Sequence, residues 1–283
     1  MTFTYIHSYL SDYSPWKNVG LNNNFILIWP DGTHDSPNGL GSWNVSKSIG
    51  PEGPICDLNR EEWDSPTECH YSCPLCDEWT SCDWQSCYDD VGFIRFVMQT
   101  VKDQWCIDEN QMHMSGYSNG GMFSYSVATS VPDNLGLATI VPVSASPHVG
   151  FGNPQASMSL SVLDMHGFFD DIIPYDRESP YCYGLSETGG VISPGGDYFE
   201  EKPTLIEEWS EIMDCQDEES YPTLFDGEGA FQCFERKCSM NRSFVRCIGN
   251  QGHWYPLSGS SAAEVAWEFM KNHPKPNNPV GYL

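Results

Sequence analysis

Gly116-Tyr117-Ser118-Asn119-Gly120-Gly121-Met122 is the stretch that decides the fold. It has the pattern G-x-S-x-G, in which glycines flank a serine and permit a sharp, strained turn from a strand into a helix. The apolar-leaning residues 112–115 before it predict the strand, and the apolar side chains after it predict a helix from Asn119 to about Ser130. We therefore expect the hydroxyl of Ser118 to be presented at the end of a strand.

Strands and helices alternate on both sides of this turn. Upstream, Phe25 to Pro30 predicts a buried strand that ends in the turn Asp31-Gly32, and Asp89 to about Gln104 predicts a helix with acidic residues at its start. Downstream, we expect strands at 137–143, 160–165 and 244–248, and helices at 204–213 and 261–271. This alternation predicts an α/β fold with a mostly parallel sheet flanked by helices.

A serine hydroxyl is a poor nucleophile until a base removes its proton and an acid orients that base. In a fold of this kind both partners follow the serine, each in a loop after a later strand. The segment after the strand at 160–165 offers Asp170 or Asp171 as the acid, and the segment after 244–248 offers His253 as the base. The other histidines considered for the base are His148, His166 and His273.

The composition excludes several classes of function. The 283 residues carry 13 basic and 39 acidic side chains, a formal charge of −26, which disfavours nucleic acid and anionic membranes as partners. No run of apolar residues is long enough to cross a membrane. With 40% hydrophobic residues the chain is globular, and we expect a small or polymeric neutral substrate and no cofactor.

Twelve cysteines and two glycosylation sequons, at Asn44 and Asn241, predict a disulfide-bonded, secreted glycoprotein. Residues 33–88 lack apolar periodicity, so we expect a disulfide-rich loop insertion within a single domain that spans residues 1–283. We predict no metal site, although the segment 69–76 also permits a zinc knuckle as an alternative. The cysteines and histidine in question are Cys69, His70, Cys73 and Cys76, and the other cysteines of the insertion are Cys56, Cys82 and Cys87.

Taken together, these motifs resemble the polyhydroxybutyrate depolymerase and feruloyl esterase-like family of secreted α/β-hydrolases. The resemblance rests on five blocks in the same order along nearly the whole chain. They are Phe25 to Gly32, Asp89 to Phe93, Gly116 to Met122, His166-Gly167 with Asp170 and Pro174-Tyr175, and Gly252-His253 with Pro256.

The resemblance implies a serine esterase that acts on polyhydroxyalkanoate, feruloyl or related esters. It assigns Ser118 as nucleophile, Asp170 as acid in preference to Asp171, and His253 as base, with the Asn119 amide in the oxyanion hole. We expect Tyr117, Trp254 and Tyr255 to line the substrate site, although the family usually has Trp where this chain has Tyr255. The resemblance also implies a disulfide from Cys215, after Trp209, to Cys233 or Cys238.

The family's early strands lie before the strand at Phe25, and one of them leads into a loop that donates the second oxyanion hydrogen bond. Only 24 residues precede Phe25, and Met1 to His7 do not have the pattern of a signal peptide. We therefore expect an N-terminally shortened domain that lacks these strands. The alternative function is a catalytically impaired hydrolase-fold protein that binds a polysaccharide or polyester.

Overall fold

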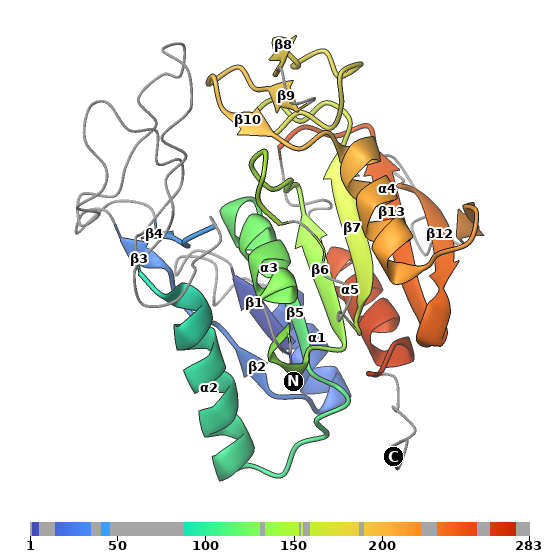
Figure 1. The fold of residues 1–283 in the computed structure, drawn as a ribbon. Helices are drawn as coiled ribbons and strands as arrows, with labels where there is room; N and C mark the ends of the chain where they lie inside the picture. Colours follow the sequence, from blue (N-terminus) through green and yellow to red (C-terminus); the bar gives the residue numbers. More distant parts are fainter. Residues whose placement is uncertain are drawn as a thin grey trace, which may run out of the picture.

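A computed structural model describes residues 2–5, 15–34, 41–45, 88–130, 134–152, 154, 159–186, 190–221, 231–253 and 261–275. Within these residues, the main sheet has eight strands in the order β11-β12-β13-β7-β6-β5-β1-β2 (Figure 1). Six neighbouring strands run parallel: β2 (Leu27–Ile28), β1 (Thr2–Tyr5), β5 (His113–Tyr117), β6 (Thr139–Val143), β7 (Ser161–Gly167) and β13 (Arg242–Gly249). At the far edge, β12 (Gln232–Cys238) is antiparallel to both β13 and β11 (Glu219–Tyr221).

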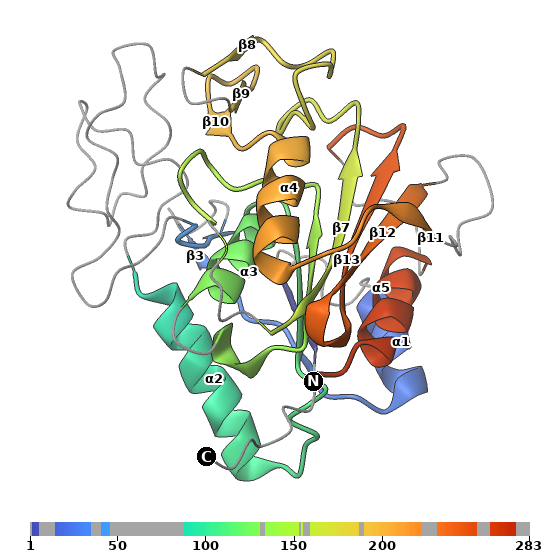
Figure 2. The ribbon, with the colours of Figure 1, turned by 45° about the vertical axis from the view of Figure 1, so that its right-hand side comes forward.

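Helices cover both faces of this sheet (Figures 1 and 2). On one face α2 (Asp90–Gln104), α3 (Asn119–Thr129) and α4 (Lys202–Met213) contribute to a large apolar core; on the other, α1 (Pro15–Asn23) and α5 (Ser261–Asn272) pack together over a second core. Burial of apolar side chains on both faces is the expected stabilisation of a parallel sheet. The predicted mostly parallel sheet flanked by helices is therefore confirmed.

The helix α2 illustrates how the sequence specifies these elements. The side chain of Asp89, one of the two acidic residues expected at the helix start, accepts a hydrogen bond of 2.8 Å from the amide of Gly92 and caps the helix. Its buried apolar residues are Ile94, Met98 and Val101, spaced four and three residues apart, so one face of the helix lies on the sheet.

Two expectations about the N-terminal part are corrected. The strand near Phe25 is not buried. β2 is the last strand of the described sheet and pairs only with β1, so residues 25–30 are half-buried. The early strands are not all missing, because β1 precedes β2 and lies parallel between β2 and β5. Its carboxyl end is thus at the same sheet edge as the turn at Ser118.

Short elements outside the main sheet complete the fold. The hairpin β3 (Thr33–His34) and β4 (Gly41–Ser42) lies within the predicted insertion, whose residues 46–87 fall outside the described part, together with the zinc-knuckle alternative. Turns of 3-10 helix occur at Asn134–Gly136 and Ser239–Asn241. A small sheet of β8 (Gly184–Leu185), β9 (Val191–Ile192) and β10 (Tyr198–Phe199) lies beyond the carboxyl ends of β7 and β13 (Figure 1).

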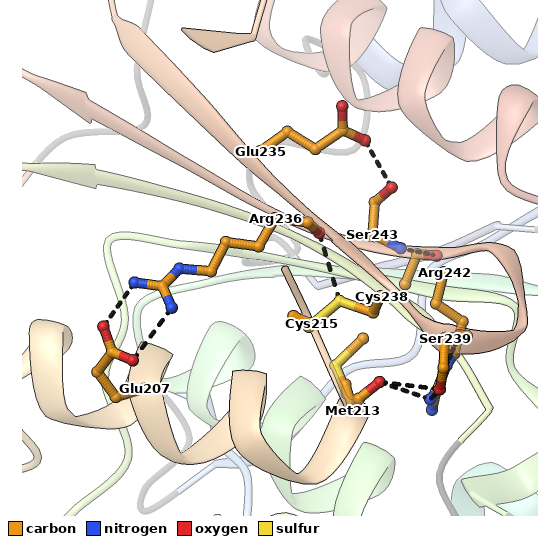
Figure 3. Close-up of a disulfide and its surroundings, with 10 residues drawn as sticks. Glu207, Met213, Cys215, Glu235, Arg236, Cys238, Ser239, Arg242 and Ser243 are labelled. Atoms are coloured by element: carbon orange, nitrogen blue, oxygen red, sulfur yellow. Dashed lines mark hydrogen bonds and ion pairs between the residues drawn. A yellow bond between two sulfur atoms is a disulfide. The ribbon is translucent and has the colours of Figure 1, made fainter. Parts of the chain in front are cut away.

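Two disulfides fasten the antiparallel end of the sheet. Cys215, just after α4, is bonded to Cys238 at the end of β12 (Figure 3), which decides between the two partners expected from the resemblance. Cys233 and Cys247 are directly opposite in the β12–β13 ladder and form the second bond. Cys106 and Cys182 form no disulfide within the part of the chain that the structure describes. These cross-links tie α4, β12 and β13 into one unit.

The sequons and the described helices bear on the expected location of the protein. The amide of Asn44 is buried and donates to the carbonyl of Tyr88, so the folded chain does not offer it for glycosylation. Asn241 is exposed. None of the helices within the described residues is long and apolar enough to cross a membrane.

Lys202, at the start of α4, is completely buried. Its ammonium group forms an ion pair with Asp164 in the middle of β7, and the hydroxyl of Tyr125 in α3 donates to the same carboxylate. Burial lowers the pKa of Lys202, opposed by the charge of Asp164. One ionic cluster therefore joins two helices to the central strand.

We predict that Lys202→Met destabilises the protein by about 3–5 kcal/mol, because it leaves the carboxylate of Asp164 buried without its cation. Urea unfolding measures the change. The matched control is Lys237→Met, since Lys237 forms an exposed ion pair of 3.0 Å with Glu219, and its loss is expected to leave the free energy of unfolding nearly unchanged. Equal unfolding midpoints for Lys202→Met and the wild type would contradict the prediction.

Candidate active site

Ser118 occupies the tight turn between β5 and α3. Its φ of 54° and ψ of −125° lie in a region that costs a non-glycine residue about 1–3 kcal/mol. Its amide donates to the carbonyl of Val143 at the end of β6 (2.9 Å), and its carbonyl accepts from the amides of Gly121 (2.8 Å) and Met122 (3.0 Å). These bonds hold the turn in its strained conformation.

The flanking glycines are required by close backbone contact. A Cβ atom on Gly116 would lie 2.0 Å from the carbonyl oxygen of Gly120, and one on Gly121 would lie 2.5 Å from the Cβ of Ala145. No side chain fits at either position. The G-x-S-x-G-G pattern therefore reflects helix and strand backbones that approach within contact distance.

The imidazole of His253 lies between Ser118 and Asp170. Its Nε2 is 2.9 Å from the Oγ of Ser118, and its Nδ1 is 2.9 Å from each carboxylate oxygen of Asp170. The three residues are 135 and 83 positions apart along the chain. In this arrangement an N–H on Nδ1 donates to the carboxylate, while Nε2 can accept the serine proton.

The loops that carry the acid and the base are joined beyond the strands. The amides of Phe168 and Phe169 donate to the carbonyls of Gly249 (2.8 Å) and Gln251 (2.9 Å), so the pairing of β7 with β13 continues past Gly167. A Cβ on Gly167 would lie 2.2 Å from the carbonyl oxygen of Gln251. This contact fixes the spacing between Asp170 and His253.

The carboxylate of Asp170 is fully buried and saturated with hydrogen bonds. Its Oδ1 accepts from the amides of Ile172 (2.9 Å) and Ile173 (2.7 Å), and its Oδ2 lies 3.2 Å from the Nε2 of His166. Burial opposes ionisation, but the hydrogen bonds from His166 and His253 prevail and hold the pKa of Asp170 well below its usual value. A buried negative charge is thereby available to stabilise an imidazolium on His253.

Asp171 and Tyr117 contact the backbone of His253. The carboxylate of Asp171 is exposed and lies 3.4 Å from the His253 amide, so it does not reach the ring. The hydroxyl of Tyr117 donates to the carbonyl of His253 at 2.8 Å, and the two rings are 5.2 Å apart. Burial, followed by the charges of Asp170 and Asp171, raises the pKa of Tyr117, which keeps this donor protonated.

Asn119 follows the serine as the first residue of α3. Its side chain is clamped to the backbone of Trp43: Oδ1 accepts from the Trp43 amide at 2.7 Å, and Nδ2 donates to the Trp43 carbonyl at 3.2 Å. Trp43 itself stacks on Phe123, one turn along α3, with ring centroids 4.8 Å apart. The start of a helix carries a partial positive charge, so the backbone N–H of Asn119 is well placed to donate a hydrogen bond to an oxyanion.

The structure thus brings together Ser118, Asp170, His253, Asn119 and Tyr117 from the residues expected in the sequence. Trp254 and Tyr255 lie outside the described residues. Of the alternative bases, His148 bonds to the Tyr198 carbonyl, His273 bonds to the Phe269 carbonyl, and His166 lies behind the acid. Within the described residues no group of three or more His, Cys, Asp or Glu is arranged to hold a metal ion.

Two contacts at the site were not expected from the sequence. The clamp from Asn119 to Trp43 joins residues 76 positions apart and has no local pattern that could reveal it. The bond from His166 to Asp170 had a usable signal, because histidine four residues before the acid stands in the His-Gly block that carries the resemblance.

The chain is similar in sequence to several curated fungal enzymes. It is 24% identical to feruloyl esterase C of Emericella nidulans over 183 residues, 64% of this chain and 57% of that protein. It is 28% identical to a bifunctional acetylxylan esterase/xylanase of Neocallimastix patriciarum over 88 residues, 31% of this chain and 12% of that protein. The chain thus spans between 12% and 57% of the length of these two relatives. No family model matches.

Among solved structures, the native protein named pOPH superimposes with a TM-score of 0.53 at 15% identity, covering all of this chain and 81% of the other. The parallel strands, the serine turn after β5, the acid after β7 and the histidine after β13 follow the order typical of one fold. The chain has the α/β-hydrolase fold. Within this fold, the sheet order places all three candidate groups at the carboxyl edge.

We predict that Gly116→Ala destabilises the protein by about 2–4 kcal/mol, because the added methyl group would overlap the Gly120 carbonyl. Gly195→Ala is the matched control, since the nearest atom to its Cβ, an oxygen of Asp197, is 3.3 Å away. Urea unfolding compares the two variants. The prediction fails if both unfold at the same urea concentration.

The lowered pKa of Asp170 predicts a pH dependence of stability. A carboxyl whose pKa is lower in the folded than in the unfolded state stabilises the protein above its unfolded value of about 3.9, and loses that effect as pH falls through the folded pKa. The stability difference between wild type and Asp170→Asn is therefore expected to be largest near neutral pH and to shrink on acidification.

Urea unfolding at a series of pH values between about 7 and 3 measures this difference. Asp171→Asn, one residue along the same loop and with an exposed carboxylate, is the control. A stability difference for Asp170→Asn that grows as the pH falls would show that the carboxyl is not stabilised in its ionised form.

Proposed function

We propose that this chain is a serine hydrolase of carboxylic esters. The observation that carries the proposal is the position of the His253 ring, with Nε2 at 2.9 Å from Ser118 Oγ and Nδ1 at 2.9 Å from Asp170. The sequence similarity to fungal feruloyl and acetylxylan esterases supports an ester as the bond that is cleaved.

In the proposed reaction, Ser118 Oγ attacks the ester carbonyl carbon while His253 Nε2 takes the hydroxyl proton. The carbonyl oxygen becomes an oxyanion, which accepts a hydrogen bond from the Asn119 amide. Asp170 stabilises the imidazolium without taking up a proton. The intermediate collapses as the ester C–O bond breaks and His253 protonates the leaving alkoxide, which leaves an acyl-enzyme on Ser118.

Water then completes the cycle. His253 Nε2 removes a proton from water, whose oxygen attacks the acyl carbon, and the second tetrahedral intermediate collapses to a carboxylic acid and the free Ser118 hydroxyl.

For the substrate, we propose an acyl ester carried by a plant polysaccharide, feruloyl or acetyl, in preference to polyhydroxyalkanoate. The names of the similar enzymes support this choice. Tyr117, Trp254 and Tyr255 are the residues that we propose line the substrate site. The two disulfides and the exposed sequon at Asn241 support a secreted protein.

A fluorophosphonate probe and p-nitrophenyl acetate test the proposal on the full chain. We expect the probe to label Ser118 and the wild type to hydrolyse the ester, while Ser118→Ala does neither. Asp170→Asn is expected to lower kcat by about 10³–10⁴-fold, because the histidine loses its ionic partner. Asp171→Asn, the matched control, is expected to retain activity within about tenfold of wild type.

Substrate class is then decided by comparing methyl ferulate, acetylated xylan and polyhydroxybutyrate at equal enzyme concentration. Failure of the wild type to react with the probe overturns the proposed hydrolase. If acetylated xylan is bound but not cleaved by unlabelled wild type, the chain is a binding protein instead. Turnover of polyhydroxybutyrate alone overturns the proposed substrate class.

A further inference from the structure

His166 is a second imidazole in contact with the candidate acid. It lies near the end of β7, four residues before Asp170, and its side chain is fully buried. Its Nε2 is 2.9 Å from the carbonyl oxygen of Ile173 and 3.2 Å from the Oδ2 of Asp170. Because a carbonyl oxygen can only accept, the hydrogen must be on Nε2, and this one N–H is shared between the carbonyl and the carboxylate.

The rest of the His166 ring makes no contact that the proposed reaction uses. The ring packs against Tyr175 in a T-shaped arrangement, with ring centroids 5.6 Å apart and planes at 87°. Its Nδ1 is buried and has no hydrogen-bond partner among the described residues. Within the described residues, the ring therefore contacts the loop that carries Asp170 through the N–H on Nε2.

The two oxygens of Asp170 share one side-chain donor and differ in the others. The Nδ1 of His253 is 2.9 Å from both oxygens. Oδ1 also accepts from the amides of Ile172 and Ile173, whereas the Nε2 of His166 lies 3.2 Å from Oδ2 and has no counterpart at Oδ1. Backbone donors therefore support Oδ1, and His166 is the contact that supports Oδ2 from the side away from His253.

Other charged or titratable groups act on the same carboxylate. Lys202 interacts with it through its positive charge, and Tyr117 and Asp171 lie on the His253 side. Only the two imidazoles hydrogen-bond to Asp170 through a side chain within the described residues. Their bonds offset the cost of burying the charge.

We propose that His166 is a positioning residue that acts through Asp170: its Nε2–H holds the buried carboxylate ionised and oriented toward His253. The inference rests on the proposed hydrolase function. A purely structural role, in which His166 only fastens the Ile173 loop, would change stability without changing how the Asp170–His253 pair binds protons.

Two variants separate these roles. His166→Leu removes the donor at similar volume, and His166→Gln keeps an N–H near the position of Nε2. For His166→Leu we expect kcat to fall about tenfold and KM to stay within about twofold, because a donor to a charged group is lost behind the site and not in it. His166→Gln is expected to recover most of kcat.

The pH profile of kcat/KM gives the readout that a structural role would not move. Without the donor from His166, the carboxylate of Asp170 attracts a proton more strongly, whether that proton binds to Asp170 or to the facing ring of His253. The acidic limb of the kcat/KM profile is therefore expected to move to higher pH by about half a unit in His166→Leu. In His166→Gln it is expected to return toward the wild-type position. An unmoved limb in a folded His166→Leu, or equal behaviour of the two variants, overturns the proposal.

A double-mutant cycle tests whether the effect passes through the acid. In the Asp170→Asn background, His166→Leu is expected to lower kcat by less than about twofold more, because its target is already gone. A full additional tenfold loss overturns the proposal. Should His166→Leu not fold, His166→Asn, whose shorter amide does not reach Oδ2, replaces it in both comparisons.

A measurement without turnover distinguishes this inference from the proposed function. In the full chain, the NMR titration midpoint of the Asp170 carboxyl is expected to move to higher pH in His166→Leu relative to wild type, because one of the hydrogen bonds that lower its pKa is lost. If the wild type hydrolyses no ester, the hydrolase proposal fails. The change in this midpoint still tests whether His166 acts on Asp170. An unchanged midpoint overturns the role of His166.

Discussion

Ser118 has a positive φ, which is unfavourable for serine, and packing and hydrogen bonds of the surrounding chain offset this cost. The absence of side chains at Gly116 and Gly121 lets α3 approach β5 and β6, and the hydrogen bond to Val143 attaches the turn to the next strand. The packing of α3 against β5 and β6 thus determines the direction in which the Ser118 hydroxyl points. The position of every other group in the site matters only relative to that direction.

The acid and the base depend on a second constraint, the continuation of strand pairing into loops. Hydrogen bonds from Phe168 and Phe169 to the chain after β13 set the distance between Asp170 and His253. The disulfides at the end of the sheet secure β13 in turn, through β12 and α4. Placement of the imidazole therefore depends on the antiparallel end of the sheet as well as on its parallel centre.

The central part of the fold could be predicted because its signals are local. The helix from Asp90 and the strands β6, β7 and β13 have runs of apolar residues with the right spacing, and the structure has them within a few residues of the expected bounds. The strands β1 and β12 were missed for physical reasons. β1 is only four residues long, and β12 is rich in polar and charged side chains, as suits a strand near the sheet edge.

The candidate site was predictable in its residue types and order but not in its geometry. Asp170 and Asp171 are adjacent and chemically identical, so the loop residues alone leave both open, and the preference for Asp170 came from the family resemblance. In the structure Asp170 is buried, accepts from the Ile172 and Ile173 amides and faces the His253 ring, whereas Asp171 is exposed. Contacts such as His166 to Asp170 and Asn119 to Trp43 depend on three-dimensional packing. The four-residue spacing of His166 and Asp170 gives a local signal for the first contact, whereas the 76 positions between Trp43 and Asn119 give none for the second.

The clamp between Asn119 and Trp43 has a consequence for how the molecule can change. Residues 43–44 and 88–90 are bound to each other, through Asn44 to Asp90 and Tyr88, and Trp43 is bound to the start of α3. The two ends of the segment 45–88 are thereby held together beside the start of α3. Because the entropy of closing a loop rises only with the logarithm of its length, this segment can be lengthened, shortened or exchanged at little cost to the serine turn. The segment between residues 45 and 88 can therefore vary in sequence and length, and acquire new binding surfaces, without displacing Ser118.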